Sequence, residues 1–343
     1  MGMIPKDEAD TNPDLGKTLR FERELRIGVL ANPRSGTTGQ DVNLCTTLVA
    51  QHKRALLRQV ITPDDVATAV KELADREVHV LAVSGGDGTL QAVLTALFRD
   101  KPFEVLPPLA LLAAGTTNLT AADVGLNGNP VRALQRLLAW SEEAGRVGQI
   151  ARRAVLRVHN GACCAPLYGM FFNAAGIVQI TRARWETRRR AKSGIGRGGA
   201  GTTVMVGEYL LGLALGRRVV APTRIGIRLD GQPLGNSDYL ALLVTTLVSM
   251  SFGIRPYWGE GPGPLKFTAI AHKPKHLILA APSLIRGKPN RYLQPEFGYL
   301  SRNINEAVLE LDGECALDGE IITRDPRHTL VISHGGEVDF LRL

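Results

Sequence analysis

Short apolar runs alternate with amphipathic segments along the first 140 or so residues of the chain. Each apolar run has the length of a buried strand and ends in polar, mostly glycine-containing sequence. One amphipathic segment has a strong helix start, with Thr62 as N-cap, Pro63 next and two acids in the first turn. The predicted strands are 26–31, 56–61, 80–83 and 109–113, and the predicted helices are 41–51, 63–76, 90–98 and 130–140. This alternation predicts a doubly wound α/β domain with a parallel sheet.

The pattern changes after about residue 148, where short apolar or alternating runs follow one another with Asp-Gly turns between some of them. Strands are expected at 154–159, 219–221, 224–229, 239–248, 265–270, 276–280, 307–311 and 329–333, and helices at 180–192 and 204–215. This part of the chain predicts an all-β domain, a β-sandwich.

The domain organisation follows from these two patterns. Residues 1–24 are expected to be a disordered leader, since their start is polar, contains two prolines and lacks the apolar core of a signal peptide. Residues 25–148 form the predicted α/β domain. Residues 149–343 form the predicted β-sandwich. Its last strand can return towards the first domain.

A glycine-rich turn ends the predicted strand 80–83. Ser84 is followed by Gly85-Gly86-Asp87-Gly88-Thr89, and a predicted helix begins directly afterwards. Free N–H groups and the positive end of the dipole at a helix N-terminus attract phosphate, and glycines let the backbone approach it closely. Asp87 would repel a phosphate unless a cation lies between them, which indicates Mg²⁺ with a nucleotide. The alternative is an ordinary turn that Asp87 or Thr89 caps.

Composition and charge narrow the class of protein only in part. A content of 44% hydrophobic and 22% charged residues is typical of a soluble globular protein, and 41 Lys and Arg against 33 Asp and Glu give a net charge of +8. This excess suits a nucleotide, an acidic lipid surface or a nucleic acid. The four cysteines form no CxxC pair or disulfide framework, which favours a cytoplasmic protein. The most apolar window, 239–250, is too short to span a bilayer.

Four motifs in order along the chain resemble the diacylglycerol kinase catalytic family, which also contains the sphingosine, ceramide and bacterial lipid kinases. They are NPRSG at residues 32–36, GGDGT at 85–89, GTTN at 115–118 and LDGE at 317–320. GGDGT alone is shared with NAD kinases, so the ordered set carries the resemblance, which extends from about residue 25 to the end.

The resemblance implies an α/β nucleotide domain and a C-terminal β-sandwich with the active site in the cleft between them. It implies transfer of the γ-phosphoryl group of ATP to a lipid hydroxyl, with Mg²⁺. Asp87, Asp318 and Glu320 would be catalytic, with Asp318 as general base and Asp87 and Glu320 at the metal. The implied nucleotide-binding residues are Asn32, Pro33, Arg34, Ser35, Gly36, Ser84, Gly85, Gly86, Gly88, Thr89, Gly115, Thr116, Thr117 and Asn118.

The chain departs from the family pattern at several positions. Leu119 stands where the family often has an acid after GTxN, and Asp123 is the nearest acid; Gln91-Ala92 replaces a usual Asn-Glu. The family's structural-metal segment is not recognisable, so that metal is not expected here. LDGE also occurs at 311–314, and we favour the second copy, with Asp318, because of its distance from the closing strand.

A basic stretch follows in the β-rich part of the chain. Its members are Arg182, Arg184, Trp185, Arg188, Arg189 and Arg190. They form either a solvated face or a surface for an anionic membrane, at which the protein would bind a lipid acceptor peripherally. No nucleic-acid-binding motif is present. A homodimer, an NAD kinase and a catalytically silent lipid-binding protein of this fold stay open as alternatives.

Overall fold

The structure is a computed structural model. It describes residues 17–20, 24–35, 39–115, 117–126, 128–161, 164–179, 182, 221–323 and 328–343. The helices expected at 180–192 and 204–215, and the strand expected at 219–221, lie outside the described residues except for Arg182 and Ala221.

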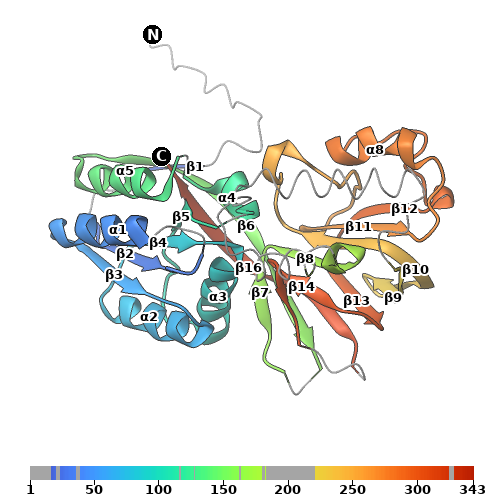
Figure 1. Cartoon of the computed structure of the whole chain (residues 1–343), viewed down its shortest axis with the longest axis horizontal. Coiled ribbons are helices and arrows are strands. Elements are labelled where there is room, and N and C mark those ends of the chain that lie inside the picture. Colours follow the sequence, from blue (N-terminus) through green and yellow to red (C-terminus); the bar gives the residue numbers. More distant parts are fainter. Residues whose placement is uncertain are drawn as a thin grey trace, which may run out of the picture.

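The N-terminal part is a parallel sheet between two layers of helices (Figure 1). Its strands are β2 (Ile27–Ala31), β3 (Ala55–Gln59), β4 (Val80–Gly85) and β5 (Leu109–Ala113), in the spatial order β3-β2-β4-β5. The helices are α1 (Gly39–Gln51), α2 (Pro63–Asp75), α3 (Asp87–Thr95), α4 (Leu119–Val124) and α5 (Pro130–Glu142), and α3 continues into a π-helical turn, Ala96–Asp100. The predicted α/β domain is confirmed.

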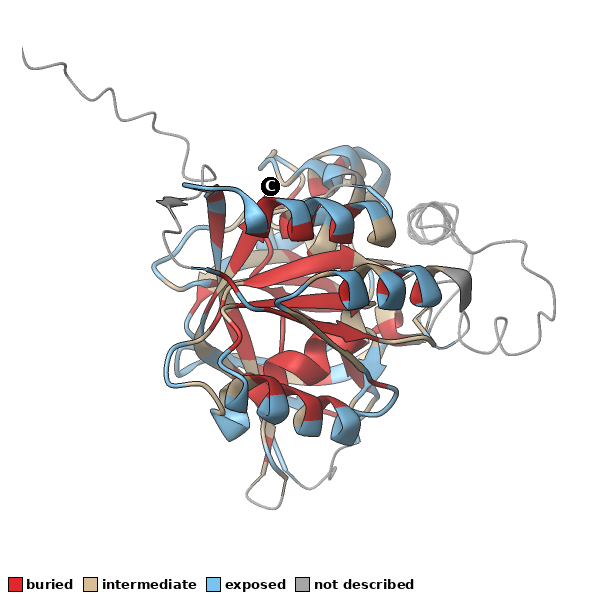
Figure 2. Cartoon of the chain, turned by 90° about the vertical axis from the view of Figure 1, so that its left-hand side faces the viewer, coloured by how far each residue is buried: buried red, intermediate tan, exposed pale blue. Residues whose placement is uncertain are grey.

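Strand β4 shows why the sheet is covered on both faces. Leu81 and Val83 pack in the hydrophobic cluster formed with α2 and α3, whereas Val80 and Ala82 pack in the cluster formed with α1 and α5. Successive side chains of a strand point to opposite faces, so a continuous apolar run supplies both clusters. Figure 2 shows the strands and the inner faces of the helices buried and the outer helix faces exposed.

The start of α2 has the geometry that its sequence predicts. The Thr62 hydroxyl accepts a hydrogen bond from the backbone N–H of Asp65 (3.2 Å), and the Asp65 carboxylate accepts one from the N–H of Thr62 (2.9 Å). Pro63 is the first helical residue. This reciprocal arrangement satisfies two N–H groups that the helix itself cannot.

The C-terminal part is an antiparallel β-rich region, as its alternating pattern predicts. Its strands are β6 (Val147–Asn160), β7 (Leu167–Gly169), β8 (Phe171–Ala175), β9 (Thr223–Leu229), β10 (Gln232–Thr245), β11 (Leu265–Ala271), β12 (Tyr299–Ile304), β13 (Glu306–Leu311), β14 (Cys315–Leu317), β15 (Glu320–Ile321) and β16 (Leu330–Arg342). It also contains helix α8 (Leu277–Arg286) and the 3₁₀ turns Ser251–Gly253 and Pro295–Phe297. Among the described residues, none of the helices is both long and apolar enough to cross a membrane.

Strand β16 joins the two parts into one sheet. Its first residues pair with β13, its whole length pairs with β6, and Phe340 near its end pairs in parallel with Leu109 of β5. The C-terminus of the chain therefore lies beside the N-terminal domain (Figure 1).

Two sequence-based expectations are wrong. The run 276–280, expected to be a strand, belongs to α8, because its buried residues Ala280 and Leu284 are spaced for a helix and a run of five apolar residues does not distinguish the two. Residues 17–20, expected to be disordered, form strand β1 (Lys17–Arg20), which pairs with β6. No short-range pattern predicts this strand because its hydrogen-bonding partner is distant in sequence.

Candidate active site

The first two motifs meet at the carboxyl edge of the parallel sheet. Asn32, directly after β2, donates a hydrogen bond from its side-chain amide to the Thr89 hydroxyl (2.9 Å), and its backbone N–H donates to the carbonyl of Ser84 (2.9 Å). Ser35 closes the first turn by donating its hydroxyl proton to the Asn32 carbonyl (2.7 Å). The loops after β2 and β4 are thus held together at the start of α3.

The third motif packs against the second, backbone on backbone. Asn118 accepts from the N–H of Gly115 and donates to its carbonyl, both at 2.8 Å, which folds the turn on itself. A Cβ at residue 115 would lie 2.5 Å from the Cα of Gly86, so only glycine fits there. These contacts bring three strand-end loops to one place, where open α/β sheets bind ligands.

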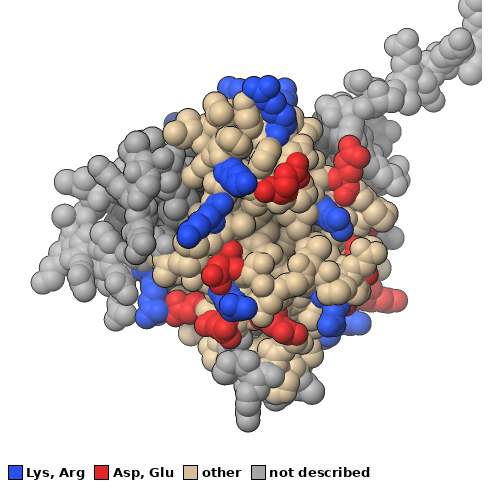
Figure 3. All heavy atoms as spheres, turned by 90° about the vertical axis from the view of Figure 1, so that its right-hand side faces the viewer, with Lys and Arg blue, Asp and Glu red and all other residues tan. Residues whose placement is uncertain are grey.

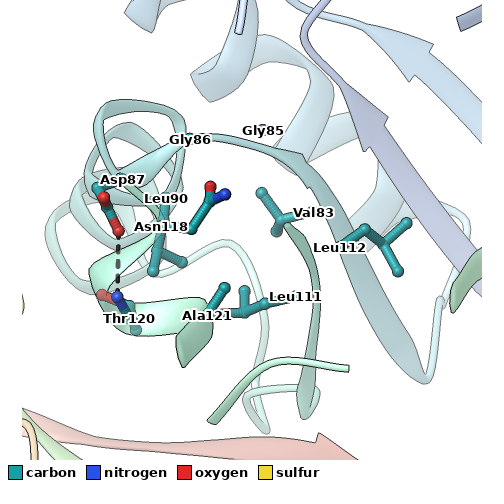
Figure 4. A pocket seen from close by; sticks show the side chains of 10 residues that line it. All are labelled: Val83, Gly85, Gly86, Asp87, Leu90, Leu111, Leu112, Asn118, Thr120 and Ala121. Carbon is teal, nitrogen blue, oxygen red and sulfur yellow. Dashed lines mark hydrogen bonds between the residues drawn. The ribbon is translucent and has the colours of Figure 1, made fainter. Parts of the chain in front are cut away.

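Asp87, the first residue of α3, points its carboxylate at the N-terminus of α4. It accepts hydrogen bonds from the N–H groups of Leu119 (3.0 Å) and Thr120 (3.1 Å), and Figure 4 shows the second of these. Leu119, at the position where the family often has an acid, therefore meets Asp87 through its backbone. Burial raises the pKa of Asp87, while these N–H groups act in the opposite direction.

A narrow pocket lies beneath Asp87, between the ends of β4 and β5 and the helices α3 and α4 (Figure 4). Its side chains are mostly apolar and include Val83, Leu90, Leu111 and Ala121. This apolar floor removes water from one side of the Asp87 carboxylate, which accounts for its raised pKa.

Asp318 approaches the same place from the β-rich region. It occupies the tight turn between β14 and β15 with a left-handed backbone (φ 50°), and Gly319 follows with φ 86°. Its carboxylate accepts hydrogen bonds from the N–H groups of Met170 and Phe171, each at 2.9 Å, and the residue is 5% exposed. Burial, and then the negative charge of Asp87, raise the pKa of Asp318 well above its usual range.

Glu320 lies across the first turn of α3. A Cβ added at Gly88 would come within 2.5 Å of its Oε1 atom, so the glycine of the second motif leaves space for this side chain. Glu320 is exposed, and partial desolvation raises its pKa. Three carboxyl groups with raised pKa values, from both parts of the chain, thus surround the start of α3.

Gly169 is a site residue that the sequence did not predict. A Cβ at this position would lie 2.2 Å from the Oδ2 atom of Asp318, so the turn between β7 and β8 accepts the carboxylate only because residue 169 is glycine. The sequence also did not predict that the backbone amides of Met170 and Phe171 belong to the site, because nothing in these residue types marks them as hydrogen-bond donors to an acid.

The remaining predicted site residues do not contact Asp87, Asp318 or Glu320 in the interactions described above. Arg34 is exposed, and Thr117 accepts a hydrogen bond on its carbonyl from the Ser251 hydroxyl (3.2 Å). In the first LDGE copy Asp312 is exposed, and Glu314 pairs with Arg182 at 2.6 Å. The predicted site residues outside the described part of the chain are Gly36, Thr116, Arg184, Trp185, Arg188, Arg189 and Arg190.

Asp123, the nearest acid after the third motif, is part of the structural junction between the domains. Its carboxylate is 3% exposed, pairs with Arg153 of β6 (2.8 Å) and accepts hydrogen bonds from the N–H groups of Val248 and Ser249. It therefore holds the loop after β10 against α4, on the same side as the Ser251–Thr117 hydrogen bond.

A divalent cation fits this donor set only in company with a ligand. Within the described ranges, no three Asp, Glu, His or Cys side chains are arranged to hold a metal ion. Mg²⁺, however, usually takes one or two protein carboxylates together with water and substrate phosphates. Asp87 and Glu320 have the chemistry for that role, and a cation near them would favour their ionised forms against the desolvation that raises their pKa values.

Known proteins are similar to this chain in sequence and in fold. Residues 26–150 match the model of the diacylglycerol kinase catalytic domain. A diacylglycerol kinase from Bacillus subtilis (strain 168) is 26% identical over 182 residues, which are 53% of this chain and 50% of that protein. A "probable lipid kinase YegS-like" from Stenotrophomonas maltophilia (strain K279a) is 40% identical over 70 residues, 20% of this chain and 23% of that protein. The matches thus span half or less of these relatives.

A crystal structure of a diacylglycerol kinase from Bacillus anthracis str. Sterne superposes on the chain with a TM-score of 0.56 and 16% identity, over 91% of this chain and 96% of that one. At this identity the likeness shows the common fold. The part of the chain that matches the diacylglycerol kinase catalytic domain, residues 26–150, contains the first three of the motifs that carry the resemblance.

Proposed function

We propose that the protein is an ATP-dependent lipid kinase that transfers the γ-phosphoryl group of ATP to a hydroxyl of diacylglycerol, ceramide or a sphingoid base. The observation that carries the proposal is the convergence of Asp87, Asp318 and Glu320, from two parts of the chain, on the start of α3. Phosphoryl transfer needs positioning and charge neutralisation more than a covalent nucleophile, and carboxylates beside a phosphate-binding turn supply both.

The nucleotide side of the site would be the three strand-end loops. The glycines of 85–88 leave the backbone accessible at the start of α3, where N–H groups and the helix dipole favour phosphate. The hydrogen bond from Asn32 to Thr89 would keep the first loop in register with this turn. Asp87 would contact Mg²⁺ that arrives with ATP, and the cation would neutralise developing charge on the phosphates.

On the acceptor side, we assign proton acceptance to Glu320, in place of the role for Asp318 that the family resemblance implies, and we leave the contact with Mg²⁺ to Asp87. Both oxygens of Asp318 already accept backbone hydrogen bonds and the residue is 5% exposed, whereas Glu320 is exposed. A general base must be reachable by the substrate hydroxyl. Asp318 would then be a positioning residue, which orders the β14–β15 turn and with it Glu320.

The proposed transfer is a displacement at the γ-phosphorus of ATP. The lipid oxygen forms a bond to the γ-phosphorus as the bond between that phosphorus and the β–γ bridging oxygen breaks, and ADP leaves with the electron pair. The hydroxyl proton passes to the Glu320 carboxylate and then to solvent.

The test is transfer of labelled γ-phosphate from ATP to diacylglycerol, ceramide, sphingosine and NAD, each assayed separately, with Mg²⁺ and mixed micelles for the lipids. We expect label in one of the lipids and a loss of about 10²–10⁴-fold in kcat for Glu320→Gln. Asp312→Asn, in the exposed LDGE copy, is the matched control for Asp318→Asn and should keep the wild-type rate.

Each other result points to a different conclusion. Label in NAD alone would make the protein an NAD kinase. ATP binding without transfer to any acceptor would favour a silent lipid-binding protein. A normal rate for Asp318→Asn together with an inactive Asp312→Asn would move the site to the first LDGE copy.

A further inference from the structure

Helix α8 is apolar on two faces, and the described residues cover only one of them. Ala280 and Leu284 are buried in a small cluster with Leu293 and Tyr299. On the other side Ile278 is 64%, Leu279 54% and Ile285 37% exposed. Large aliphatic side chains grouped in this way on the surface of a helix indicate an interaction surface.

Basic residues flank this apolar face at both ends. Lys273 and Lys275 precede the helix, Arg286 ends it, and Lys288 and Arg291 follow; all five are exposed. Residues 272–298 contain one acid, Glu296, so that this segment carries five Lys or Arg against one Glu. Figure 3, which views the molecule from the side on which α8 lies in Figure 1, shows Lys and Arg side chains at the top of the molecule.

The C-terminal end of α8 is connected to the candidate active site through one chain segment. The N–H of Arg255 donates to the carbonyl of Ile285 (2.8 Å), and Gly287 packs against the carbonyls of Arg255 and Tyr257. The same segment leads back to Ser251, which bonds Thr117 of the third motif. In Figure 1 the helix lies at the upper right, above β11 and β12.

We propose that the face of α8 formed by Ile278, Leu279 and Ile285, with its flanking Lys and Arg residues, docks the protein on an anionic lipid bilayer. An interfacial helix inserts its apolar side chains at the level of the headgroups, while basic residues beside it attract acidic lipids. Charge selects this occupant, because cations at both ends of an apolar face match an anionic bilayer and would repel a second copy of the same surface. The role of this surface rests on the proposed function, since docking would bring the candidate active site to an acceptor lipid in the membrane.

The test measures binding to vesicles and needs no catalysis. The full chain is floated with vesicles of equal parts phosphatidylcholine and phosphatidylglycerol, and with phosphatidylcholine alone. We expect binding to the mixed vesicles only, weakened at high salt because screening acts on the basic residues. The triple variant Ile278→Ser/Leu279→Ser/Ile285→Ser should bind at least about tenfold more weakly, and Lys288→Ala about fivefold.

Matched controls lie on the N-terminal domain. Val105→Ser removes a side chain that is 81% exposed, and Lys71→Ala removes an exposed cation of α2. Both should bind vesicles as the wild type does, and thermal unfolding should show that all variants fold. Wild-type vesicle binding by the triple variant would overturn the proposal. A dimer that the triple variant converts to a monomer, without effect on vesicle binding, would assign the face to a second copy.

The two proposals fail separately. Vesicle binding that depends on α8 without any phosphorylated lipid in micelles would reject the kinase function and keep the surface. Phosphorylation in micelles with no vesicle binding would reject the surface and keep the kinase.

Discussion

The Asp318 carboxylate occupies the space in which any residue other than glycine at position 169 would place its Cβ atom. The Oδ2 atom lies 2.2 Å from that point and accepts the N–H of Met170 at 2.9 Å. The tight β14–β15 turn and the β7–β8 connection, from segments far apart in the chain, are therefore mutually fitted.

This contact makes Gly169→Ala a test of positioning. The methyl group should displace Asp318 and the turn that carries Glu320, so we expect kcat to fall by about 10²-fold with little change in KM for ATP. Gly226→Ala is the control, since a Cβ atom at position 226 would first meet the side chain of Glu310, at 3.3 Å. Steady-state kinetics on both variants decide the matter, and an active Gly169→Ala enzyme would contradict the fitted arrangement.

The raised pKa values predict how activity depends on pH. Burial raises the pKa of Asp318 and partial desolvation raises that of Glu320, and the charge of Asp87 raises the pKa of Asp318 further. A proton acceptor works only when ionised, so the acid limb of the kcat/KM profile should lie at higher pH than the ordinary pKa of a glutamate gives. The apparent value belongs to the coupled group of carboxyls. An acid limb at or below the ordinary pKa of a glutamate would contradict Glu320 as the acceptor, and Glu320→Gln should lose this limb.

The buried ion pair of Asp123 and Arg153 should support stability at the domain junction. Asp123→Ala removes the carboxylate that pairs with the guanidinium of Arg153, which is 10% exposed, and we expect a loss of about 3–5 kcal/mol in the free energy of unfolding. The neighbouring pair Arg152–Asp339 is more exposed, so Asp339→Ala should cost below about 1 kcal/mol. Denaturant unfolding of the two variants measures the difference, and equal losses would refute the assigned role of Asp123.

The hydrogen bond from Asn32 to Thr89 should matter for the nucleotide more than for the fold. Asn32→Ala removes the connection between the first two motifs, and we expect about 1 kcal/mol of lost stability and about tenfold weaker ATP binding. Asn129→Ala removes the N-cap of α5, with a similar loss of stability and unchanged ATP affinity. Calorimetric titration with ATP separates the two effects. Weaker binding by both variants would mean that destabilisation alone is responsible.

Local signals determined much of the N-terminal domain. Apolar runs covered on both faces, the Thr62–Pro63 helix start and the glycines after β4 act over a few residues, and each has the expected structure. The same locality explains the failures. The apolar run at 276–280 suits a strand or a helix until the packing of Ala280 and Leu284 decides, and strand β1 exists only because β6 offers it hydrogen-bonding partners.

The sequence by itself determined the order of elements in the α/β domain, the β-rich character of the remainder and the motifs whose residues meet at the candidate site, because these depend on periodicity and on motifs of a few residues. Only the tertiary structure decided that Asp318 lies close enough to Asp87 to be affected by its charge, that Gly169 leaves room for Asp318, and that Asp123 joins the domains. Such relationships come from pairing strands that are distant in the chain, and β16 makes them possible by continuing one sheet through both parts.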